Sequence, residues 1–201
     1  DGALRKLIVG LGGTMTHNSS SERVLRHVLR ACEAVGAETR LFDGNALDLP
    51  MYGWGSPRTE KAVELIDGLR RAEGIVIASP GYHGTVSGLI KNALDYVEDM
   101  AKDARPYFEG RAVGLIAVAA GWQATGTTLA TLRSIVHALR GWPTPMAVTV
   151  NSQTPVFDDD GAVADGSLLK QLDVLARQVV GFARMKALDD LARATSDARS
   201  D

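Results

Sequence analysis

The sequence predicts a single α/β domain in which a parallel sheet is covered by helices on both faces, and three observations lead to this prediction. Apolar runs of strand length recur along the chain with helical patterns between them, as in repeated β-α units. The strongest runs are apolar without alternation, as expected of strands that are buried on both faces. The length of 201 residues suits one domain with a sizeable core.

The first part of the chain is predicted as strand, helix, strand and loop. Residues 7–11 are apolar throughout and fit a central strand. Apolar residues recur at helical spacing from about Ser21, and Gly36 follows where this first helix would end. Residues 39–42 fit a short second strand. Residues 43–57 contain several Gly and Pro residues and have no clean period, so we expect a long loop there.

The middle of the chain repeats the pattern. A helix through residues 63–69 precedes the strong apolar strand 74–78, which stops at a turn of residues 79–84. A helix is predicted from Gly88 to about Met100, because Leu89, Ala93, Tyr96 and Met100 share one helical face, and residues 112–119 fit another buried strand. A turn that follows a buried strand in this way is a common place for chemistry.

The next segment again runs from a strand into a Gly-containing loop. After the loop at residues 120–122, apolar residues at helical spacing predict a helix over 129–139. Residues 146–150 then fit a fifth strand. The count is five strands and about five helices.

The end of the chain is predicted as one long helix behind an acidic loop. Residues 152–165 fit a surface loop, and residues 168–182 carry the apolar face of the final helix. We expect residues 1–201 to form one domain with its core at about 6–183, and the tail after Ala194 to be frayed.

Composition excludes several classes of function. The chain has 22 Lys and Arg against 24 Asp and Glu, so it lacks the basic face that nucleic-acid binding requires. No apolar run approaches the ~20 residues that span a bilayer, so no membrane partner is expected. The single Cys32 excludes an internal disulfide and a cysteine-rich zinc site, and no export signal opens the chain. A cytoplasmic location is therefore expected.

Three loops that follow strands are the candidate site. In an open α/β sheet, ligands bind outside the carboxyl ends of the strands, where the strand order reverses. We therefore expect residues 12–21, 79–84 and 119–123 to converge in space.

The first of these loops has the composition of a phosphate subsite. It combines two adjacent glycines with five hydroxyl side chains just before a helix, and helix amides with hydroxyls suit a phosphate dianion. The alternative is that the serines serve only as helix caps, because Ser is common at that position. The segment fits neither the nucleotide triphosphate loop nor the dinucleotide fingerprint. The five hydroxyl residues are Thr14, Thr16, Ser19, Ser20 and Ser21.

The other two loops supply one histidine and two aromatic residues. His83 is either a general base or, as we favour, a hydrogen-bonding loop residue, because no recognisable motif places an acid or a nucleophile beside it. Tyr82 and Trp122 lie in Gly-containing turns, where they either stack on a flat ligand or pack the loop. No His pair has metal-ligand spacing, so no metal site is predicted.

The second loop and its following helix carry a family resemblance. Residues 79–96 read Ser-Pro-Gly-Tyr-His-Gly-Thr-Val-Ser-Gly-Leu-Ile-Lys-Asn-Ala-Leu-Asp-Tyr, and they closely resemble the second flavin loop of the NADPH-dependent FMN reductase family. The first loop resembles the phosphate loop of that family, with Gly13, Thr14 and Ser19 in register. The resemblance extends more loosely from about Lys6 to Phe182.

The resemblance implies a flavodoxin-like three-layer sandwich with a five-stranded parallel sheet of order 2-1-3-4-5. It also implies an FMN-dependent NAD(P)H oxidoreductase, in which a hydride passes from NAD(P)H to the flavin N5 and electrons then pass to a flavin, quinone or similar small molecule. No protein side chain is required as a catalyst. A homodimer or homotetramer is expected.

The same resemblance assigns roles to individual residues. Thr14 and the serines would hold the FMN phosphate, and Thr16 stands where the family usually has Arg, which removes a charge-assisted contact. Gly81 stands where many members have Glu. The residues implied to line the ribityl chain and the ring are Pro80, Gly81, Tyr82, His83, Gly84, Gly121 and Trp122.

Three alternatives remain open at this point. The first is an FMN-dependent dehydrogenase or reductase of one organic metabolite, enclosed by Trp122 and loop 43–57. The second is a flavin-bearing electron carrier, which the net charge of −2 disfavours because such carriers usually have a strongly acidic face. The third is a structural domain without a cofactor, which Thr16 in place of Arg keeps open.

Overall fold

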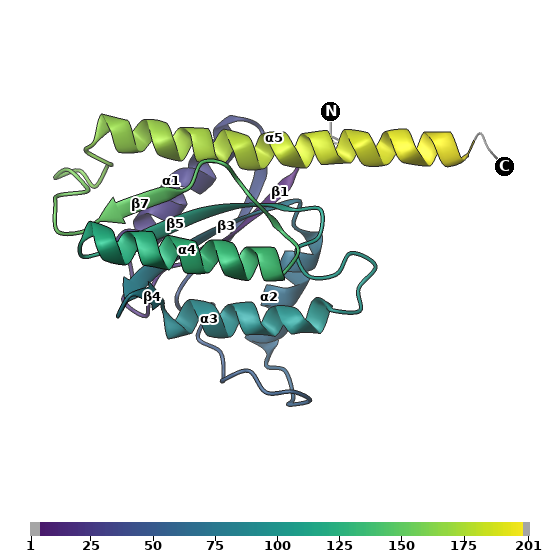
Figure 1. Ribbon diagram of the computed structural model, residues 1–201, viewed down its shortest axis with the longest axis horizontal. Coiled ribbons are helices and arrows are strands. Elements are labelled where there is room, and N and C mark those ends of the chain that lie inside the picture. The colour runs from purple at the N-terminus through teal and green to yellow at the C-terminus, as the bar shows by residue number, and fades with distance from the viewer. Residues whose placement is uncertain (1–4, 199–201) are drawn as a thin grey trace.

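The computed structural model describes residues 5–198 and has three layers, with a twisted sheet between two layers of helices (Figure 1). Parallel pairing joins the long strands in the order β2-β1-β3-β5, and β7 pairs with β5. The strands are β1 (Leu7–Gly12), β2 (Glu38–Phe42), β3 (Gly74–Tyr82), β4 (Thr85–Val86), β5 (Ala112–Ala119), β6 (Trp142–Pro143) and β7 (Val148–Asn151).

Five α-helices cover the two faces of the sheet. They are α1 (Ser20–Ala34), α2 (Glu60–Arg71), α3 (Gly88–Asp95), α4 (Trp122–Ala138) and α5 (Gly166–Asp197). Helices α1 and α5 pack on one face, and α2, α3 and α4 pack on the other. Within each long strand, neighbouring residues face opposite layers, so Val9 contacts the α2 side while Ile8 contacts the α1 side. This explains why the strand sequences are apolar without alternation.

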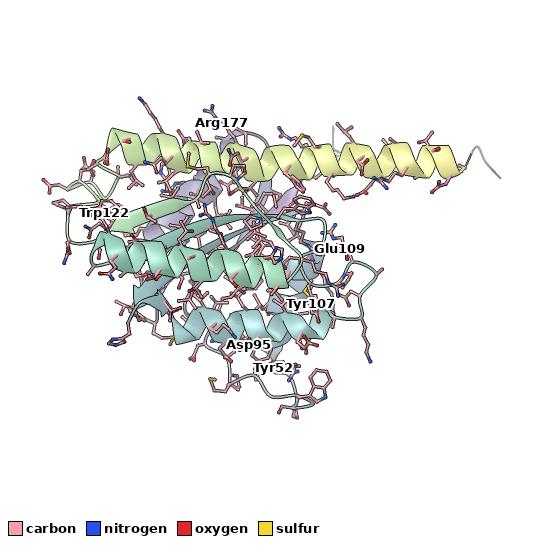
Figure 2. The ribbon with its side chains drawn as sticks, viewed as in Figure 1. Tyr52, Asp95, Tyr107, Glu109, Trp122 and Arg177 are labelled. Carbon is pink, nitrogen blue, oxygen red and sulfur yellow. The ribbon has the colours of Figure 1, made fainter. Side chains whose placement is uncertain are left out.

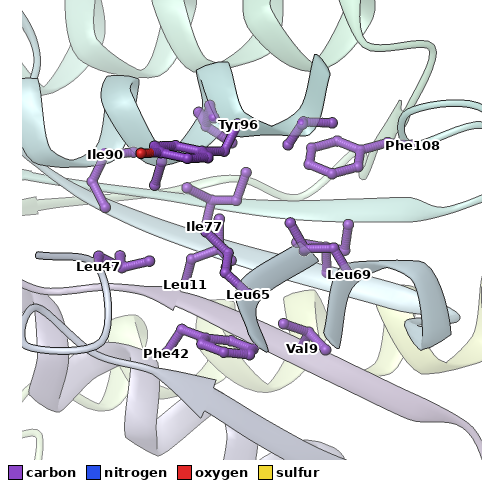
Figure 3. Close-up of a cluster of buried hydrophobic side chains, with 14 of the residues drawn as sticks. Val9, Leu11, Phe42, Leu47, Leu65, Leu69, Ile77, Ile90, Tyr96 and Phe108 are labelled. Carbon is purple, nitrogen blue, oxygen red and sulfur yellow. The ribbon is translucent and has the colours of Figure 1, made fainter. Parts of the chain in front are cut away.

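The core on the α2 side is the larger of the two and is shown in Figure 3. Leu65 and Leu69 of α2 pack against Leu11 of β1 and Ile77 of β3, and all four side chains are almost completely buried. Burial of this kind stabilises the fold by about 1.5–3 kcal/mol for each large apolar side chain. The sheet and its helices therefore form a rigid base for the loops at the strand ends.

The strand order confirms the predicted topology, but the sheet has seven strands where five were predicted. Counted as β2, β1, β3, β5 and β7, the long strands follow the order 2-1-3-4-5. The predicted fifth strand over 146–150 corresponds to β7, which pairs with the end of β5, and Trp142 and Pro143 form an additional short strand that pairs with the start of β5. Pro145 lies between these two short strands and has no amide to donate to a ladder, which keeps them separate.

Two element boundaries differ from the prediction in the second half of the chain. Helix α4 begins at Trp122 rather than near Leu129. The sequence pattern missed its first two turns because they carry mostly small polar residues and have no apolar period. The predicted helix over 88–100 is α3 followed by a 3-10 helix, Tyr96–Met100.

The C-terminal end also differs from the prediction. We expected fraying after Ala194, but α5 is helical through Asp197. Within residues 5–198, no helix is long and apolar enough to cross a membrane.

Candidate functional site

The first loop begins where β1 ends and leads directly into α1. Gly13 has a φ of 107°, a conformation that L side chains rarely adopt, and Asn18 has a φ of 58°. Thr14 Oγ1 accepts the Thr16 amide at 3.0 Å, which closes a tight local turn. The loop therefore follows a fixed path that exposes Met15 and Thr16 to solvent.

Ser19 is the N-cap of α1, which bears out the capping role considered for the serines. Its Oγ accepts the Glu22 amide at 3.4 Å, and the buried Glu22 carboxylate accepts the Asn18 amide at 3.1 Å. This reciprocal arrangement resembles a capping box. The cap leaves the amides of Ser20 and Ser21, at the first two helical positions, without an acceptor inside the helix. Ser21 is buried, so Ser20 is the better placed of the two to meet a ligand.

The arginines near the first loop are engaged elsewhere. Arg26 donates to the Glu22 carboxylate at 2.9 Å and so balances that buried charge. Arg23 donates to Gly161 O at 3.0 Å and lies 3.6 Å above the Phe157 ring. Neither compensates for the absence of Arg at Thr16. Hydroxyl groups and the amino end of α1 are thus the groups with which this loop could bind an anion.

The second loop is a tight β-hairpin. Strand β3 continues through Pro80 to Tyr82, beyond the predicted end at residue 78, and pairs antiparallel with β4. His83 and Gly84 form the two-residue turn, with φ of 50° and 85°, as a type I′ turn requires. The hairpin was not predicted from the sequence, because it has only two paired residues on each side and such a short segment gives no recognisable apolar run.

Buried serines hold the hairpin against α3. Ser79 is fully buried, and its Oγ accepts the Ser87 amide at 3.1 Å and donates to Pro80 O at 2.8 Å. Ser87 is also the N-cap of α3, through the Ile90 amide. These bonds fix the hairpin and the amino end of α3 relative to each other.

His83 does not have the role that we favoured from the sequence. Its side chain is exposed and makes no hydrogen bond within residues 5–198. A hydrogen-bonding role in the loop is therefore wrong.

The first loop, the hairpin and α3 together form a cavity of about 210 Å³. It lies at the carboxyl ends of β1 and β3, where the strand order reverses, as expected for a ligand site in this architecture. The cavity is smaller than the about 300–1,000 Å³ of typical ligand pockets and is open, since Met15 is 61% exposed and Tyr82 51% exposed. Its lining residues are Gly13, Thr14, Met15, Thr16, Pro80, Tyr82, Ser87, Gly88 and Leu89.

The structure brings together only some of the predicted site residues. Four of them line the cavity, namely Thr14, Thr16, Pro80 and Tyr82. The serines lie one turn further at the start of α1, and Gly121 and Trp122 lie at the end of β5 outside the lining. Met15 and the amino end of α3 were missed, because their residue types carry no chemical signal in the sequence.

The third loop is held by an amide side chain at the end of β7. Asn151 is largely buried, and its Oδ1 accepts the Gly121 amide at 2.9 Å and the Gln153 amide at 3.0 Å. Gly121 has a φ of 100° and leads into α4, whose first residue, Trp122, is 64% exposed. Trp122 therefore has a fixed backbone and a free ring, which is labelled at the start of α4 in Figure 2.

The long loop 43–57 does not take part in the cavity. Its first part lies against the first loop, since a Cβ on Gly44 would meet Thr14 O. Its aromatic part is fixed elsewhere: the Tyr52 amide donates to Asn92 Oδ1 at 2.8 Å, and the Tyr52 ring packs edge-on against Tyr96. Figure 2 shows Tyr52 below α3 and well separated from Trp122. The expectation that this loop encloses a substrate is not supported.

The comparison with protein families decides what kind of site this is. The family model described as NADPH-dependent FMN reductase matches residues 7–155, most of the chain. The chain belongs to the NADPH-dependent FMN reductase family. The family consists of oxidoreductase enzymes that depend on FMN, so FMN is the cofactor and the carrier and cofactor-free alternatives are set aside.

Individual relatives agree with membership of the FMN reductase family. The chain is 24% identical over 196 residues to the FMN-dependent NADPH-azoreductase of Staphylococcus aureus strain USA300, across 92% of this chain and 97% of that protein. It resembles the structure of RosB with a bound flavin intermediate, with a TM-score of 0.75, 16% identity, and 96% and 87% of the two chains covered. It also resembles the structure of a flavodoxin, WrbA-like protein from Agrobacterium tumefaciens, with a TM-score of 0.63, 15% identity, and 90% and 99% of the two chains covered. The fold is flavodoxin-like.

The geometry of this FMN reductase family member fits a flavin nucleotide. Glycines allow close approach where the chain is tightest: a Cβ on Gly12 would lie 2.6 Å from Ala78 O, and Gly13 needs its positive φ. The amino end of α1, which suits an anion, lies beside an open cavity with an aromatic edge. Within residues 5–198 no group of three metal-ligating side chains is present.

Proposed function

We propose that this protein is an FMN-dependent NADPH oxidoreductase that delivers electrons to a small planar acceptor such as a quinone, a free flavin or an azo compound. The observation that carries the proposal is the cavity at the reversal of strand order, where loop 13–16 and the β3-β4 hairpin meet. When bound, FMN accepts a hydride at N5 from NADPH and supplies electrons to the acceptor.

The protein residues have binding and positioning roles in this proposal. Thr14, Ser19 and Ser20, with the first amides of α1, hold the phosphate. Pro80 and the hairpin backbone from Gly81 to Gly84 lie along the ribityl chain and the ring. Ser79 and Ser87 hold the hairpin in place through buried hydrogen bonds.

An open ring face favours a broad range of acceptors. Met15 and Tyr82 line the cavity while remaining more than half exposed, so a flat molecule reaches the ring without displacing a closed lid. Gly121 and Trp122 border the same end of the sheet, and an exposed indole provides a stacking surface. A dedicated reductase of one metabolite is the weaker candidate, because loop 43–57 does not cover the cavity.

We propose that the enzyme is cytoplasmic and assembles as a homodimer or homotetramer. The location is supported by a lone buried cysteine and by the use of reduced nicotinamide as electron donor. The assembly is supported by exposed large apolar side chains on the surface, including Trp122, Trp142 and Leu191.

An anaerobic titration tests the reaction. Purified protein is loaded with FMN, and NADPH is added in steps while the absorbance of the oxidised flavin is followed. We expect full bleaching at one equivalent of NADPH and recovery of the absorbance on addition of a quinone or an azo dye. Flavin that binds but stays oxidised would contradict the oxidoreductase proposal.

A second comparison tests the phosphate subsite without relying on turnover. Ser20 is neither the cap nor buried, so Ser20→Ala removes a ligand hydroxyl with little effect on the fold. We expect weaker FMN binding, by roughly fivefold, from one lost hydrogen bond of ~1 kcal/mol, and unchanged binding of riboflavin, which lacks the phosphate. Equal losses for both ligands would place the phosphate elsewhere.

A further inference from the structure

Asn151, the last residue of β7, ties two loops together through its side chain. The residue is only 8% exposed, and its Oδ1 accepts both the Gly121 amide at 2.9 Å and the Gln153 amide at 3.0 Å. A buried polar atom stabilises the fold only when it is paired, and here one oxygen serves two donors. A side chain without this oxygen would therefore release both loops at once.

The chain that follows β7 is folded tightly around Asn151. Ser152 N donates to Ala119 O at 2.9 Å, which extends the pairing of β7 with β5 by one bond. Thr154 Oγ1 donates to Asn151 O at 3.1 Å and closes the turn. The backbone of Asn151 is thus held by the sheet, so its side chain is a fixed anchor for the third loop.

The bond to Gly121 fixes the point at which α4 begins. Gly121 is the N-cap residue of α4, has a φ of 100° and makes no side-chain cap. Because glycine reaches many backbone conformations, its own preference does not hold this one, and the contact with Asn151 does. The next residue is Trp122, whose carbonyl accepts Thr125 Oγ1 at 2.7 Å. The direction in which the Trp122 side chain leaves the helix therefore depends on Asn151.

The start of α4 lies against the hairpin that borders the flavin cavity. A Cβ on Gly81 would lie 2.8 Å from Ala119 Cβ and 3.4 Å from Ala124 O. Tyr82 follows Gly81 and lines the cavity. Figure 1 shows β4 and the start of α4 at the same end of the molecule. Two rings, Tyr82 at 51% and Trp122 at 64% exposure, are thus presented to solvent by adjoining segments.

We propose that Asn151 is a positioning residue for the electron acceptor: through Gly121 it holds Trp122 beside the flavin cavity, where the indole stacks on a planar aromatic acceptor. This rests on the proposed function, in which the acceptor enters from the open side at Tyr82. Trp122 lies outside the cavity lining, so its ring is available to the acceptor rather than to the flavin. Stacking needs a ring in a fixed place, and an anchor on the sheet supplies it.

Steady-state kinetics of the FMN-loaded protein separate acceptor binding from the rest of the reaction. The acceptors are naphthoquinone and ferricyanide, which has no ring to stack. The KM for naphthoquinone should rise about tenfold in Trp122→Leu and about threefold in Asn151→Ser, whose shorter hydroxyl does not reach both amides. The kcat and the KM for ferricyanide should not change. Asn151→Asp keeps an oxygen for both amides and should retain the wild-type KM.

The double variant Asn151→Ser/Trp122→Leu shows whether Asn151 acts through Trp122. In that case the double variant has the KM of Trp122→Leu alone, whereas independent effects would multiply. Trp122 is exposed, so its substitution leaves the fold intact. Asn92 is the matched control, because it is 5% exposed and holds another loop by accepting the Tyr52 amide at 2.8 Å. Asn92→Ser should lower stability without changing the KM for naphthoquinone.

The rate at which NADPH bleaches bound FMN distinguishes this proposal from the proposed function. We expect the same rate in the wild type and in every variant. A wild type that NADPH does not bleach would overturn the proposed function and the role of Asn151 with it. Normal bleaching with an unchanged KM for naphthoquinone in Trp122→Leu or Asn151→Ser, or with multiplied effects in the double variant, would overturn the role of Asn151 alone.

Discussion

At the scale of single residues, Gly81 shows how closely the hairpin is packed. A Cβ at this position would lie 2.6 Å from Thr128 Oγ1 and 2.8 Å from Ala119 Cβ. A side chain at position 81 would therefore point toward α4 and β5 and away from the cavity. This accounts for glycine where many members of the family have Glu: the space that a larger residue needs is filled by Thr128, which is fully buried.

The Gly81→Ala substitution should reduce stability. Overpacking of a tight site costs about 1–3 kcal/mol, and we expect that loss in urea denaturation. The second substitution Thr128→Ala removes the nearest atom, so the double variant should recover most of the loss. Gly88→Ala is the matched control, because nothing lies within 4 Å of its Cβ direction and its stability should not fall. A Gly81→Ala variant as stable as the wild type contradicts this account.

Thr16 is the residue at which the flavin site departs most from the family. Arg23 and Arg26 are engaged by Gly161 and Glu22, so neither of them replaces the usual arginine. Thr16→Arg should therefore tighten FMN binding about tenfold or more, since hydrogen bonds to charged groups contribute ~1.5–3 kcal/mol. Isothermal titration with FMN and riboflavin measures the effect. Riboflavin binding should not change, and equal tightening for both flavins would indicate a contact other than the phosphate.

At the scale of elements, the packing of α1 on α5 buries the imidazole of His27. His27 Nε2 of α1 is buried and has no hydrogen bond, and Asp173 Oδ1 of α5 is 3.8 Å away, too far for one. Burial lowers the pKa of His27 below its ordinary value of 6.5, although the Asp173 carboxylate opposes this shift. The neutral imidazole is thus the form that the folded state prefers.

The sign of the pH dependence follows from that shift. Because the folded pKa lies below the unfolded one, the stabilisation is complete above pH 6.5 and is lost as the pH falls toward the folded pKa. We expect the urea midpoint of the wild type to fall more steeply between pH 7 and pH 5 than that of His27→Gln, which does not titrate. Parallel curves for the two proteins would show that His27 is not responsible.

At the scale of the whole molecule, the sheet separates two cavities at its two ends. One lies at the carboxyl ends of β1 and β3, where the flavin is proposed to bind, and the other is lined by Ala112 at the start of β5 and by Trp142. The rigid core between them, shown in Figure 3, keeps the two ends at a fixed separation.

Flavin binding should stabilise the whole domain, because the loops that hold it are continuous with core strands. At 100 times its Kd, a ligand that binds only the folded state adds about 2.7 kcal/mol. For a domain of this size that corresponds to roughly 5–10 °C in Tm, measurable by differential scanning fluorimetry or calorimetry. FMN should give a larger shift than riboflavin at equal concentration. No shift with either flavin would contradict the assigned site.

The sequence by itself determined the fold class, the long strands and the loops that carry the site. The strands of this fold are buried on both faces, so their residues are uniformly apolar and recognisable from local pattern alone. Strand-end loops then meet because parallel strands end at one edge of the sheet, which placed Thr14, Thr16, Pro80 and Tyr82 correctly around one cavity.

Only the tertiary structure decided the features that depend on distant contacts. The β3-β4 hairpin, the start of α4 at Trp122 and the contribution of Ser87 to the cavity rest on bonds such as Ser87 N to Ser79 Oγ, which no local pattern encodes. The same holds for Met185, Leu188 and Leu191 in the last part of α5, which are apolar but exposed. Whether such residues face the core or solvent is set by where the sheet ends, and that is a property of the folded chain.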